Sequence, residues 1–280
     1  MKNIGAHKYL HGKVIVLLAP LGNAFQEFLS GTLPKIAQVY DILATHPDVR
    51  ILIHKPRDDI IYGILESLNL SGDRFIFNEQ GSNTQYVVET LINGCNTPPL
   101  HPFLWQQMRH MIGVNDQLTV PVNQSLVILI RRGNTKNSSR HILNFMKIAK
   151  YLKERYGDRF IIFAPSYEVT FSLVKSLFGR ASIILGVHGG AFFNHLLAPK
   201  SCHIVEYIPM IKYGETIKPL DYNIIWMMSH MIEQTYWRVH EKTGSQSGDI
   251  VINVDNLKLV LDKVDRAIKH NSIGKALHNM

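Results

Sequence analysis

The sequence lacks the features that mark several protein classes. It has only two cysteines, Cys95 and Cys202, which lie far apart and outside any CxxC spacing. This argues against a disulfide framework and a zinc ribbon, and it favours a reducing compartment. There is no extended tract of Gln, Ser or Gly, and hydrophobic residues make up 46% of the chain against 19% for charged residues. The composition is therefore that of a folded globular protein.

Long hydrophobic runs are missing too. The apolar run near the N-terminus, VIVLLAP at 14–20, is too short for a membrane span and makes a poor signal peptide. We therefore expect a soluble, cytoplasmic protein with no membrane span. The sequence also has no Asp-x-Asp, no HExxH and no cluster of His and Cys at metal-ligand spacing. We accordingly expect neither a metal nor another cofactor.

Acidic residues are fewer than basic ones. Against 30 Lys and Arg there are 22 Asp and Glu, which gives a formal charge of +8. Such a balance favours anionic partners without distinguishing nucleic acid, a membrane surface or a phosphorylated small molecule. The basic stretch RRGNTKNSSR at 131–140 keeps nucleic-acid binding as an alternative, but no RNP, KH or helix-turn-helix pattern is present. We predict no nucleic-acid partner.

Short apolar runs rich in Ile, Val, Leu and Phe alternate with longer segments of helical spacing. The runs lie at 14–20, 50–56, 73–79, 125–133, 159–165, 181–187 and 202–209. Strands that alternate with helices predict a parallel sheet covered on both faces. The polar segment 116–124 separates two such series. We predict two α/β domains, residues 1–120 and 121–254, followed by a terminal helix and tail, 255–280.

The segment VHGGAFFNHLLA, directly after the predicted strand 181–187, is the most informative stretch. If it opens a helix, its first amides have no helical acceptors and favour an anion. Gly189 and Gly190 permit positive φ and a close approach of the backbone to a phosphate. His188 can donate to a phosphate oxygen, and Asn194 can hold the loop or bind ligand hydroxyls. The alternative is a tight turn with a hydrogen-bonded core histidine.

Four blocks of the sequence resemble glycosyltransferase family 61, which includes protein O-GlcNAc transferases and plant β-1,2-xylosyltransferases. The blocks are 130–144, where Arg131, Arg140 and Asn144 match, 171–209, which contains the HGG loop, and, more loosely, 23–36 and 222–239. The resemblance implies the GT-B fold, in which two Rossmann-like domains face each other across a cleft. Residues 1–120 would then bind the acceptor and 121–254 the nucleotide sugar.

The resemblance also implies the reaction. It is an inverting transfer of a sugar, xylose first and GlcNAc next, from a UDP-sugar to a hydroxyl of a glycan or glycoprotein acceptor. Xylose is favoured only because the short chain also resembles the β-xylosyltransferases of large algal viruses. The N-terminal block, 23–36, has Gln26 and Glu27 where the family usually has a His and a downstream Glu. A catalytically inactive nucleotide-binding scaffold is therefore a second alternative.

Candidate nucleotide-side residues follow the carboxyl ends of the predicted strands, where doubly wound sheets bind ligands. Arg131 would hold the diphosphate through its planar fork, whereas we interpret Arg132 as part of a solvated rim. Glu206 would accept from the ribose hydroxyls, or else pair with a basic residue. The predicted set comprises Arg131, Arg140, Ser166, His188, Gly189, Gly190, Ala191, Asn194 and Glu206.

An inverting transfer also needs a general base beside the incoming hydroxyl. The candidates in the N-terminal half are acids that end predicted strands or lie in a neighbouring turn. They are Glu27, Asp58, Asp59, Asp73 and Glu79. Each has an ordinary interpretation as a helix cap or surface acid, and the sequence does not choose among them.

Overall fold

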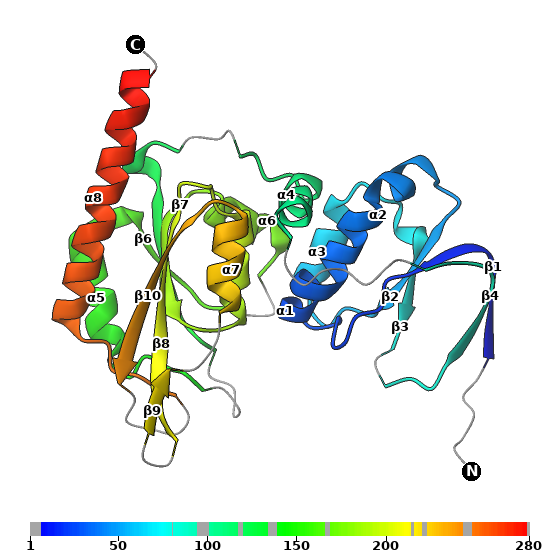
Figure 1. Ribbon diagram of the computed structural model, residues 1–280, viewed down its shortest axis with the longest axis horizontal. Helices are drawn as coiled ribbons and strands as arrows, with labels where there is room; N and C mark the ends of the chain where they lie inside the picture. The colour runs from blue at the N-terminus through cyan, green and yellow to red at the C-terminus, as the bar shows by residue number, and fades with distance from the viewer. Residues whose placement is uncertain are drawn as a thin grey trace. The chain divides into compact units, whose positions relative to one another are not determined.

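The chain forms two compact units, seen in Figure 1. The first comprises Met1–Asn115 and Tyr167–Ser176, and the second comprises Asp116–Ser166 and Leu177–Met280. Each unit has its own parallel sheet, which confirms the predicted α/β class. This computed structural model describes residues 7–79, 81–93, 101–116, 120–133, 139–165, 169–213, 216–219, 223–242 and 248–278.

The sheet of the first unit has the order β3-β2-β1-β4, and every neighbouring pair is parallel. Its strands are β1 (His7–Val16), β2 (Arg50–His54), β3 (Phe75–Asn78) and β4 (Gln85–Asn93). Its helical segments are α1 (Phe25–Glu27), a π-helix (Phe28–Thr32), α2 (Leu33–Thr45), α3 (Asp59–Ser67), a 3-10 helix (Gly72–Arg74) and α4 (Pro102–Met111). Strand β2 buries Ile51, Leu52 and Ile53 in succession, as a parallel strand with both faces covered must.

A buried arginine connects several segments of the first unit. The guanidinium of Arg74 donates to the backbone carbonyls of Leu43, His46 and Val49 at 2.8 to 2.9 Å. These three carbonyls come from the end of α2 and from the turn before β2. The bonds satisfy a buried charged group and fix where β2 begins.

The sheet of the second unit has the order β10-β8-β7-β5-β6, again parallel, with β9 antiparallel to β8. Its strands are β5 (Leu126–Ile130), β6 (Phe160–Phe163), β7 (Ala181–Val187), β8 (His203–Tyr213), β9 (Thr216–Pro219) and β10 (Thr235–Lys242). Its α-helices are α5 (Phe145–Tyr156), α7 (Ile224–Met231) and α8 (Val254–His278), while α6 (Phe171–Phe178) belongs to the first unit as far as Ser176. Three 3-10 helices complete the described part: Val122–Gln124, Gly157–Arg159 and Gly190–Leu197.

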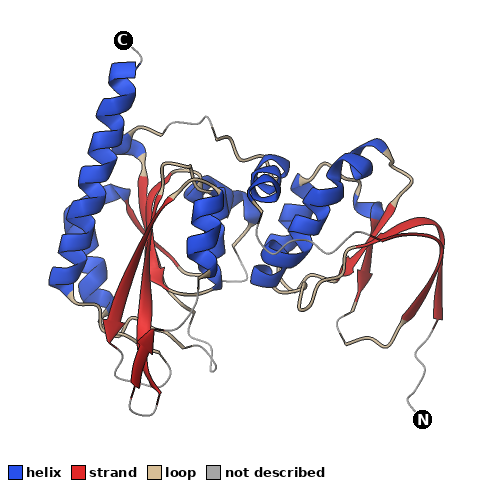
Figure 2. Ribbon diagram, viewed as in Figure 1, coloured by secondary structure: helices blue, strands red, loops and turns tan. Residues whose placement is uncertain are grey.

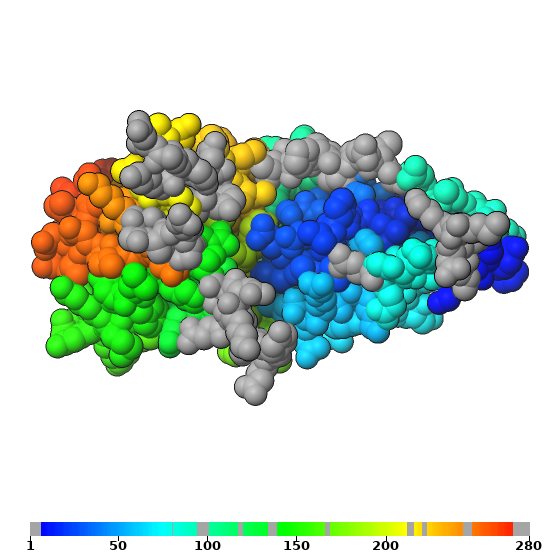
Figure 3. Space-filling view, turned by 90° about the horizontal axis from the view of Figure 1, so that it is seen from below, coloured from blue at the N-terminus to red at the C-terminus, as the bar shows by residue number. Residues whose placement is uncertain are grey.

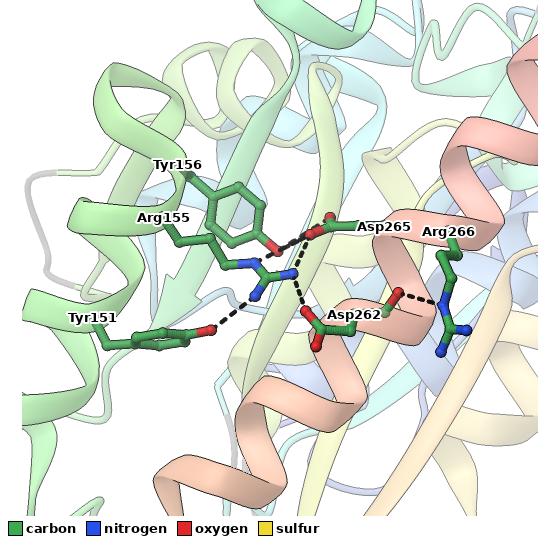
Figure 4. Close-up of polar contacts among 6 residues, drawn as sticks. All are labelled: Tyr151, Arg155, Tyr156, Asp262, Asp265 and Arg266. Atoms are coloured by element: carbon green, nitrogen blue, oxygen red, sulfur yellow. Dashed lines mark hydrogen bonds and ion pairs between the residues drawn. The ribbon is translucent and has the colours of Figure 1, made fainter.

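Helices α5 and α8 lie together on one side of this sheet and α7 lies on the other (Figure 2). The surfaces of α5 and α8 adjoin in Figure 3, where α8 is orange and α5 is green. Figure 4 shows the polar contact between them: Arg155 of α5 donates to Asp262 and Asp265 of α8, each at 2.6 Å, and to the hydroxyl of Tyr151 at 2.8 Å. This network fixes α8 against the sheet.

Every predicted strand corresponds to an observed one, and all but β7, which matches the run 181–187, have shifted ends. Strand β1 starts seven residues earlier than the predicted run at 14–20 and stops at Val16. Strands β4, β9 and β10 were not predicted. Strand β4 lies at the edge of its sheet with a mostly exposed surface, and β10 carries charged residues, so neither has the continuous apolar run of a buried strand.

Candidate functional site

The carboxyl ends of β5 and β7 form the central part of the candidate site in the second unit. Gly186 of β7 packs so closely on β5 that an added Cβ would lie 3.1 Å from both Cβ and O of Ile130. Beyond β7 come His188 and Gly189, and then the 3-10 helix Gly190–Leu197. The sequence predicted a helix here. The observed helix is of the 3-10 type, which is tighter than an α-helix, so it cannot be assigned the partial positive charge that an α-helix has at its N-terminus.

Gly189 is required for space and not for a special backbone angle. Its φ is 171°, which is extended backbone, and neither Gly189 nor Gly190 adopts a left-handed φ. The expectation of positive φ in this loop is therefore wrong. A Cβ on Gly189 would overlap Nη1 of Arg132, so the missing side chain makes room for that guanidinium.

Arg132 is half-buried, and its Nη1 donates to the backbone carbonyl of His188 at 3.3 Å. Its Nε is buried and has no hydrogen-bond partner among the described residues. Burial lowers the pKa of Arg132, and the nearby charge of Arg140 lowers it further. The interpretation of Arg132 as a solvated rim residue is wrong, because its side chain is packed against the HGG loop.

A pocket of about 220 Å³ opens beside this arginine. It is lined by Ile130, Arg131, Arg132, Arg140, His141, Ile142, Leu143, Phe145 and Val187. None of these residues carries a carboxylate, so the arginines give the pocket a concentrated positive charge. Arg131 lies with its guanidinium 5.0 Å from the ring centre of Phe145, and Arg140 adopts a left-handed φ of 67°.

Asn144 holds the end of the arginine-bearing segment through its side-chain amide. Its side-chain Nδ2 donates to the carbonyl of Ile252 at 2.9 Å, and its Oδ1 accepts from the Ile252 N–H at 3.0 Å. Backbone bonds between His141 or Leu143 and Ile250 extend the same junction. Asn144 therefore clamps the end of the loop to the segment before α8, which is a structural role.

His188, Glu206 and Tyr236 form a largely buried polar chain that connects the turn after β7 with β8 and β10. Nδ1 of His188 lies 2.5 Å from Oε1 of Glu206, and the hydroxyl of Tyr236 donates to Oε2 of Glu206 at 2.5 Å. Glu206 has no exposed surface and His188 is 5% exposed. Burial raises the pKa of Tyr236, and the nearby Glu206 raises it further, so its hydroxyl stays protonated.

The predicted contact of Glu206 with ribose hydroxyls does not fit this geometry. Both of its oxygens already accept hydrogen bonds, and the carboxylate has no surface to offer a ligand. Glu206 instead pairs with a nearby basic residue, His188, which is the alternative that the sequence left open.

The remaining nucleotide-side residues follow the same turn. Asn194 is 3% exposed, and its Nδ2 donates to the carbonyl of Ala191 at 2.9 Å, so it holds the 3-10 helix. Its buried position disfavours the alternative of binding ligand hydroxyls. Gly190 and Ala191 are partly exposed beside the turn. Ser166 lies outside the described residues.

The five candidate bases are scattered over the first unit. Asp58 directly precedes α3 beyond the carboxyl end of β2 and is half-buried, and the backbone N–H of Phe25 donates to it. Burial raises the pKa of Asp58, and the neighbouring Asp59 raises it further, against an opposing effect of Arg57. Asp59 is exposed in the first turn of α3, and Glu27 is a partly buried residue of α1.

Two of the candidates have positions that weaken them. Glu79 forms an exposed ion pair with Lys55 at 2.7 Å. Asp73 lies in the 3-10 helix that precedes β3, so it is at the amino end of the strand, and its carboxylate accepts from Ser71. This position argues against Asp73 as the base, because the turn leads into the amino end of β3 and not to its carboxyl end.

Beside Asp58, the loop after β1 is tightly packed around buried polar groups. An added Cβ at Gly22 would lie 2.5 Å from Oγ1 of Thr32, which belongs to the π-helix. Oδ1 of Asn23 and Oγ1 of Thr32 are buried without a hydrogen-bond partner among the described residues. π-helical turns are uncommon and concentrate at functional sites.

Comparison with known proteins identifies the family. The family model described as Glycosyltransferase 61 matches residues 21–205, which is more than half of the chain. The chain belongs to glycosyltransferase family 61. It is therefore a member of a family of enzymes that transfer sugars, as the resemblance implied. No curated protein matches the chain in sequence.

Solved structures that resemble this family 61 chain are distant. The iron-containing dodecameric glycosyltransferase TibC from enterotoxigenic E. coli is 14% identical with a TM-score of 0.37, and the match covers 84% of this chain and 66% of TibC. This chain thus spans about two thirds of the length of TibC. E. coli heptosyltransferase WaaC with ADP is 9% identical with a TM-score of 0.40, covering 91% and 100%. A family 9 glycosyl transferase from Veillonella parvula is 9% identical with a TM-score of 0.37, covering 81% and 86%.

Two side chains of the family 61 site were missed by sequence reasoning. Arg132 was set aside as a rim residue, although its position directly after a buried strand was a signal for a site residue. Tyr236 lies within the block 222–239, but no sequence pattern indicates which strand lies beside β8. The structure describes no group of His, Cys, Asp or Glu side chains that could hold a metal ion. Among the described helices, none has the length and apolarity needed to cross a membrane.

Proposed function

We propose that this family 61 glycosyltransferase takes its sugar from a UDP-sugar and binds the diphosphate at the arginine pocket of the second unit. The observation that carries the proposal is the packing of Arg131, Arg132 and Arg140 around one pocket with no lining carboxylate. The charge of Arg140 lowers the pKa of Arg132, so these two guanidiniums lie close enough to repel each other. A bound diphosphate would relieve this repulsion and supply an acceptor for the buried Nε of Arg132.

The same residues suit the chemistry of the departing nucleotide. Negative charge grows on the diphosphate as its bond to the anomeric carbon breaks. Fixed donors stabilise that charge in the transition state, and one such donor contributes about 3 kcal/mol. Arg132 is held against the carbonyl of His188, so its guanidinium is placed before the reaction begins. We propose that these side chains act in place of a metal ion.

For the acceptor, we propose Asp58 as the general base. It is half-buried at the carboxyl end of β2, and its raised pKa brings the carboxylate closer to the range in which a base accepts a proton near neutral pH. It would take the proton of a glycan hydroxyl as that oxygen attacks the anomeric carbon opposite the leaving diphosphate. Such a displacement inverts the anomeric configuration. Xylose is our first choice of donor sugar and GlcNAc the second, a preference supported only by sequence resemblance.

Thermal unfolding with nucleotides tests the donor site. A ligand at about 100 times its dissociation constant adds about 2.7 kcal/mol to the stability of the native state. We expect UDP, UDP-xylose and UDP-GlcNAc to raise the melting temperature in the presence of EDTA, and GDP-fucose to raise it less. Arg132→Ala should abolish most of that shift. Arg266→Ala, which removes the same charge from an exposed position on α8, should leave it intact.

The outcomes separate the alternatives. Stabilisation by UDP compounds together with sugar transfer supports the whole proposal. Stabilisation without turnover on any glycan acceptor would favour the inactive scaffold. If no nucleotide stabilises the chain but an oligonucleotide does in low salt, the transferase proposal fails in favour of nucleic-acid binding.

A further inference from the structure

The buried chain His188–Glu206–Tyr236 follows from the strand register. Glu206 on β8 lies opposite Gly186 on β7 and opposite Arg238 on β10. Side chains two residues along a neighbouring strand point to the same face and lie within reach of an aromatic or other long side chain. His188 is two residues beyond Gly186, and Tyr236 is two residues before Arg238. Glu206 is therefore flanked diagonally by a histidine on one side and a tyrosine on the other.

The protonation states in this chain are restricted by its chemistry. The Tyr236 hydroxyl stays protonated and donates to Oε2 of Glu206. With Glu206 as a carboxylate it can only accept, so the His188 nitrogen that faces it, Nδ1, must carry a proton. A carboxylate with no exposed surface is stable only with such charge-assisted partners.

The His188 backbone is held as firmly as its ring. Its N–H donates to the carbonyl of Tyr207 at 3.2 Å, and its carbonyl accepts from Arg132 at 3.3 Å. One residue thus connects the buried chain with the arginine pocket. Any shift of the imidazole would be transmitted to the position of Arg132.

We infer that Glu206 and Tyr236 are positioning residues, which hold His188 in the tautomer protonated at Nδ1 and thereby keep its backbone carbonyl where it holds Arg132 at the donor's diphosphate. This inference rests on the proposed function. Glu206 then supports the donor site through His188 and does not make the ribose contact that the sequence had suggested. Tyr236 joins the residues on which donor binding depends.

Two substitutions test the inference with little change of shape. Tyr236→Phe removes only the hydroxyl that donates to Glu206. Glu206→Gln keeps the size and an oxygen that can accept, but its amide can also donate to Nδ1, so both tautomers of His188 become available. The matched control is Tyr207→Phe. Tyr207 is also fully buried, adjoins Glu206 on β8, and its hydroxyl has no hydrogen-bond partner within the described residues.

Three measurements on the full chain distinguish positioning from a structural role: the NMR signals of the His188 ring nitrogens, the affinity for UDP by calorimetry, and the melting temperature. We expect Glu206→Gln to shift the ring-nitrogen signals toward a mixture of tautomers. Both variants should weaken UDP binding about 10-fold, the order expected for a lost charge-assisted hydrogen bond, while they remain folded. Tyr207→Phe should change neither the signals nor the affinity.

The two proposals fail in different ways. If the unaltered chain binds UDP and both variants keep its affinity and its His188 signals, the positioning role is overturned and the donor site stands. If the unaltered chain binds no nucleoside diphosphate, the proposed function is overturned and the inference with it. A fall in melting temperature with unchanged UDP affinity in the folded fraction would show that the chain serves stability alone.

Discussion

The carboxyl-end edges of the two sheets differ in how their polar groups are held. At the edge of the second unit, His188, Glu206 and Arg132 are linked to one another by hydrogen bonds within a packed turn. In the first unit, Asp58 and Glu79 end neighbouring strands separately, one half-buried and the other in an exposed ion pair. The two edges are thus built in different ways.

The difference follows from what each half is proposed to bind. A diphosphate has a fixed shape and a high charge, and preorganised donors bind it best. An acceptor hydroxyl needs one base of suitable pKa within hydrogen-bonding reach, and the surrounding contacts vary with the glycan. We therefore expect substitutions at the second edge to weaken donor binding, and those at the first edge to slow the reaction with donor binding unchanged.

The largest expected effect is that of Asp58→Asn. Removal of a general base lowers kcat about 10²- to 10⁴-fold. The amide keeps an oxygen for the Phe25 N–H, and loss of a carboxylate whose pKa is raised by burial should not destabilise the fold. Steady-state kinetics with a glycan acceptor measure the loss, and calorimetry should show unchanged UDP affinity. As the pH is lowered, a base with a raised pKa becomes protonated earlier. The kcat of the unaltered enzyme should therefore begin to fall at a higher pH than it would with an ordinary aspartate as the base.

Asp59→Asn is the matched control for this prediction, since it removes an adjacent but exposed carboxylate. It should retain most of the activity. If the two variants lose activity equally, or if Asp58→Asn is as active as the unaltered enzyme, another group supplies the base. The contrast between a single base on one edge and a donor network on the other would then need revision.

The second prediction concerns stability in acid, which should be governed by the second unit. Burial lowers the pKa of His203 from 6.5 to about 4, against a small opposing effect of Asp265. Its Nδ1 accepts from the Trp237 indole N–H at 3.0 Å, which requires the neutral ring. Between pH 6.5 and about 4 the unfolded state binds more protons than the folded state, so stability falls as the pH drops through this window. The loss amounts to about 3 kcal/mol.

Urea unfolding at a series of pH values measures this loss. His203→Gln, which keeps a hydrogen-bond acceptor but does not titrate, should flatten the pH dependence over that window. The exposed His46 of the first unit provides a control, and His46→Gln should leave the profile unchanged. An unaltered slope in His203→Gln would mean that this histidine is not the main source of acid sensitivity.

The sequence predicted local features better than contacts between strands. The buried strands and the HGG turn were predictable, because continuous apolar runs and a histidine-glycine turn are local patterns. The pairing of Glu206 with His188 and Tyr236 was not, because it depends on the register of β7, β8 and β10. The role of Gly189 was predicted for the wrong reason: it is a matter of space for Arg132, which only the packed structure reveals.

The smallest predicted effect tests that packing directly. Gly189→Ala is compatible with the extended backbone at this position, so the fold should form. The added methyl group occupies the place of Nη1 of Arg132, and the flexible guanidinium must move away from the His188 carbonyl. We expect UDP affinity to fall about 10-fold, since one charge-assisted contact is misplaced but the other arginines remain. Gly72→Ala is the control in the first unit, because nothing lies within 4 Å of its added Cβ. Equal UDP affinity in the two variants would show that the position of Arg132 does not matter for the donor, and the donor edge would then be no more preorganised than the acceptor edge.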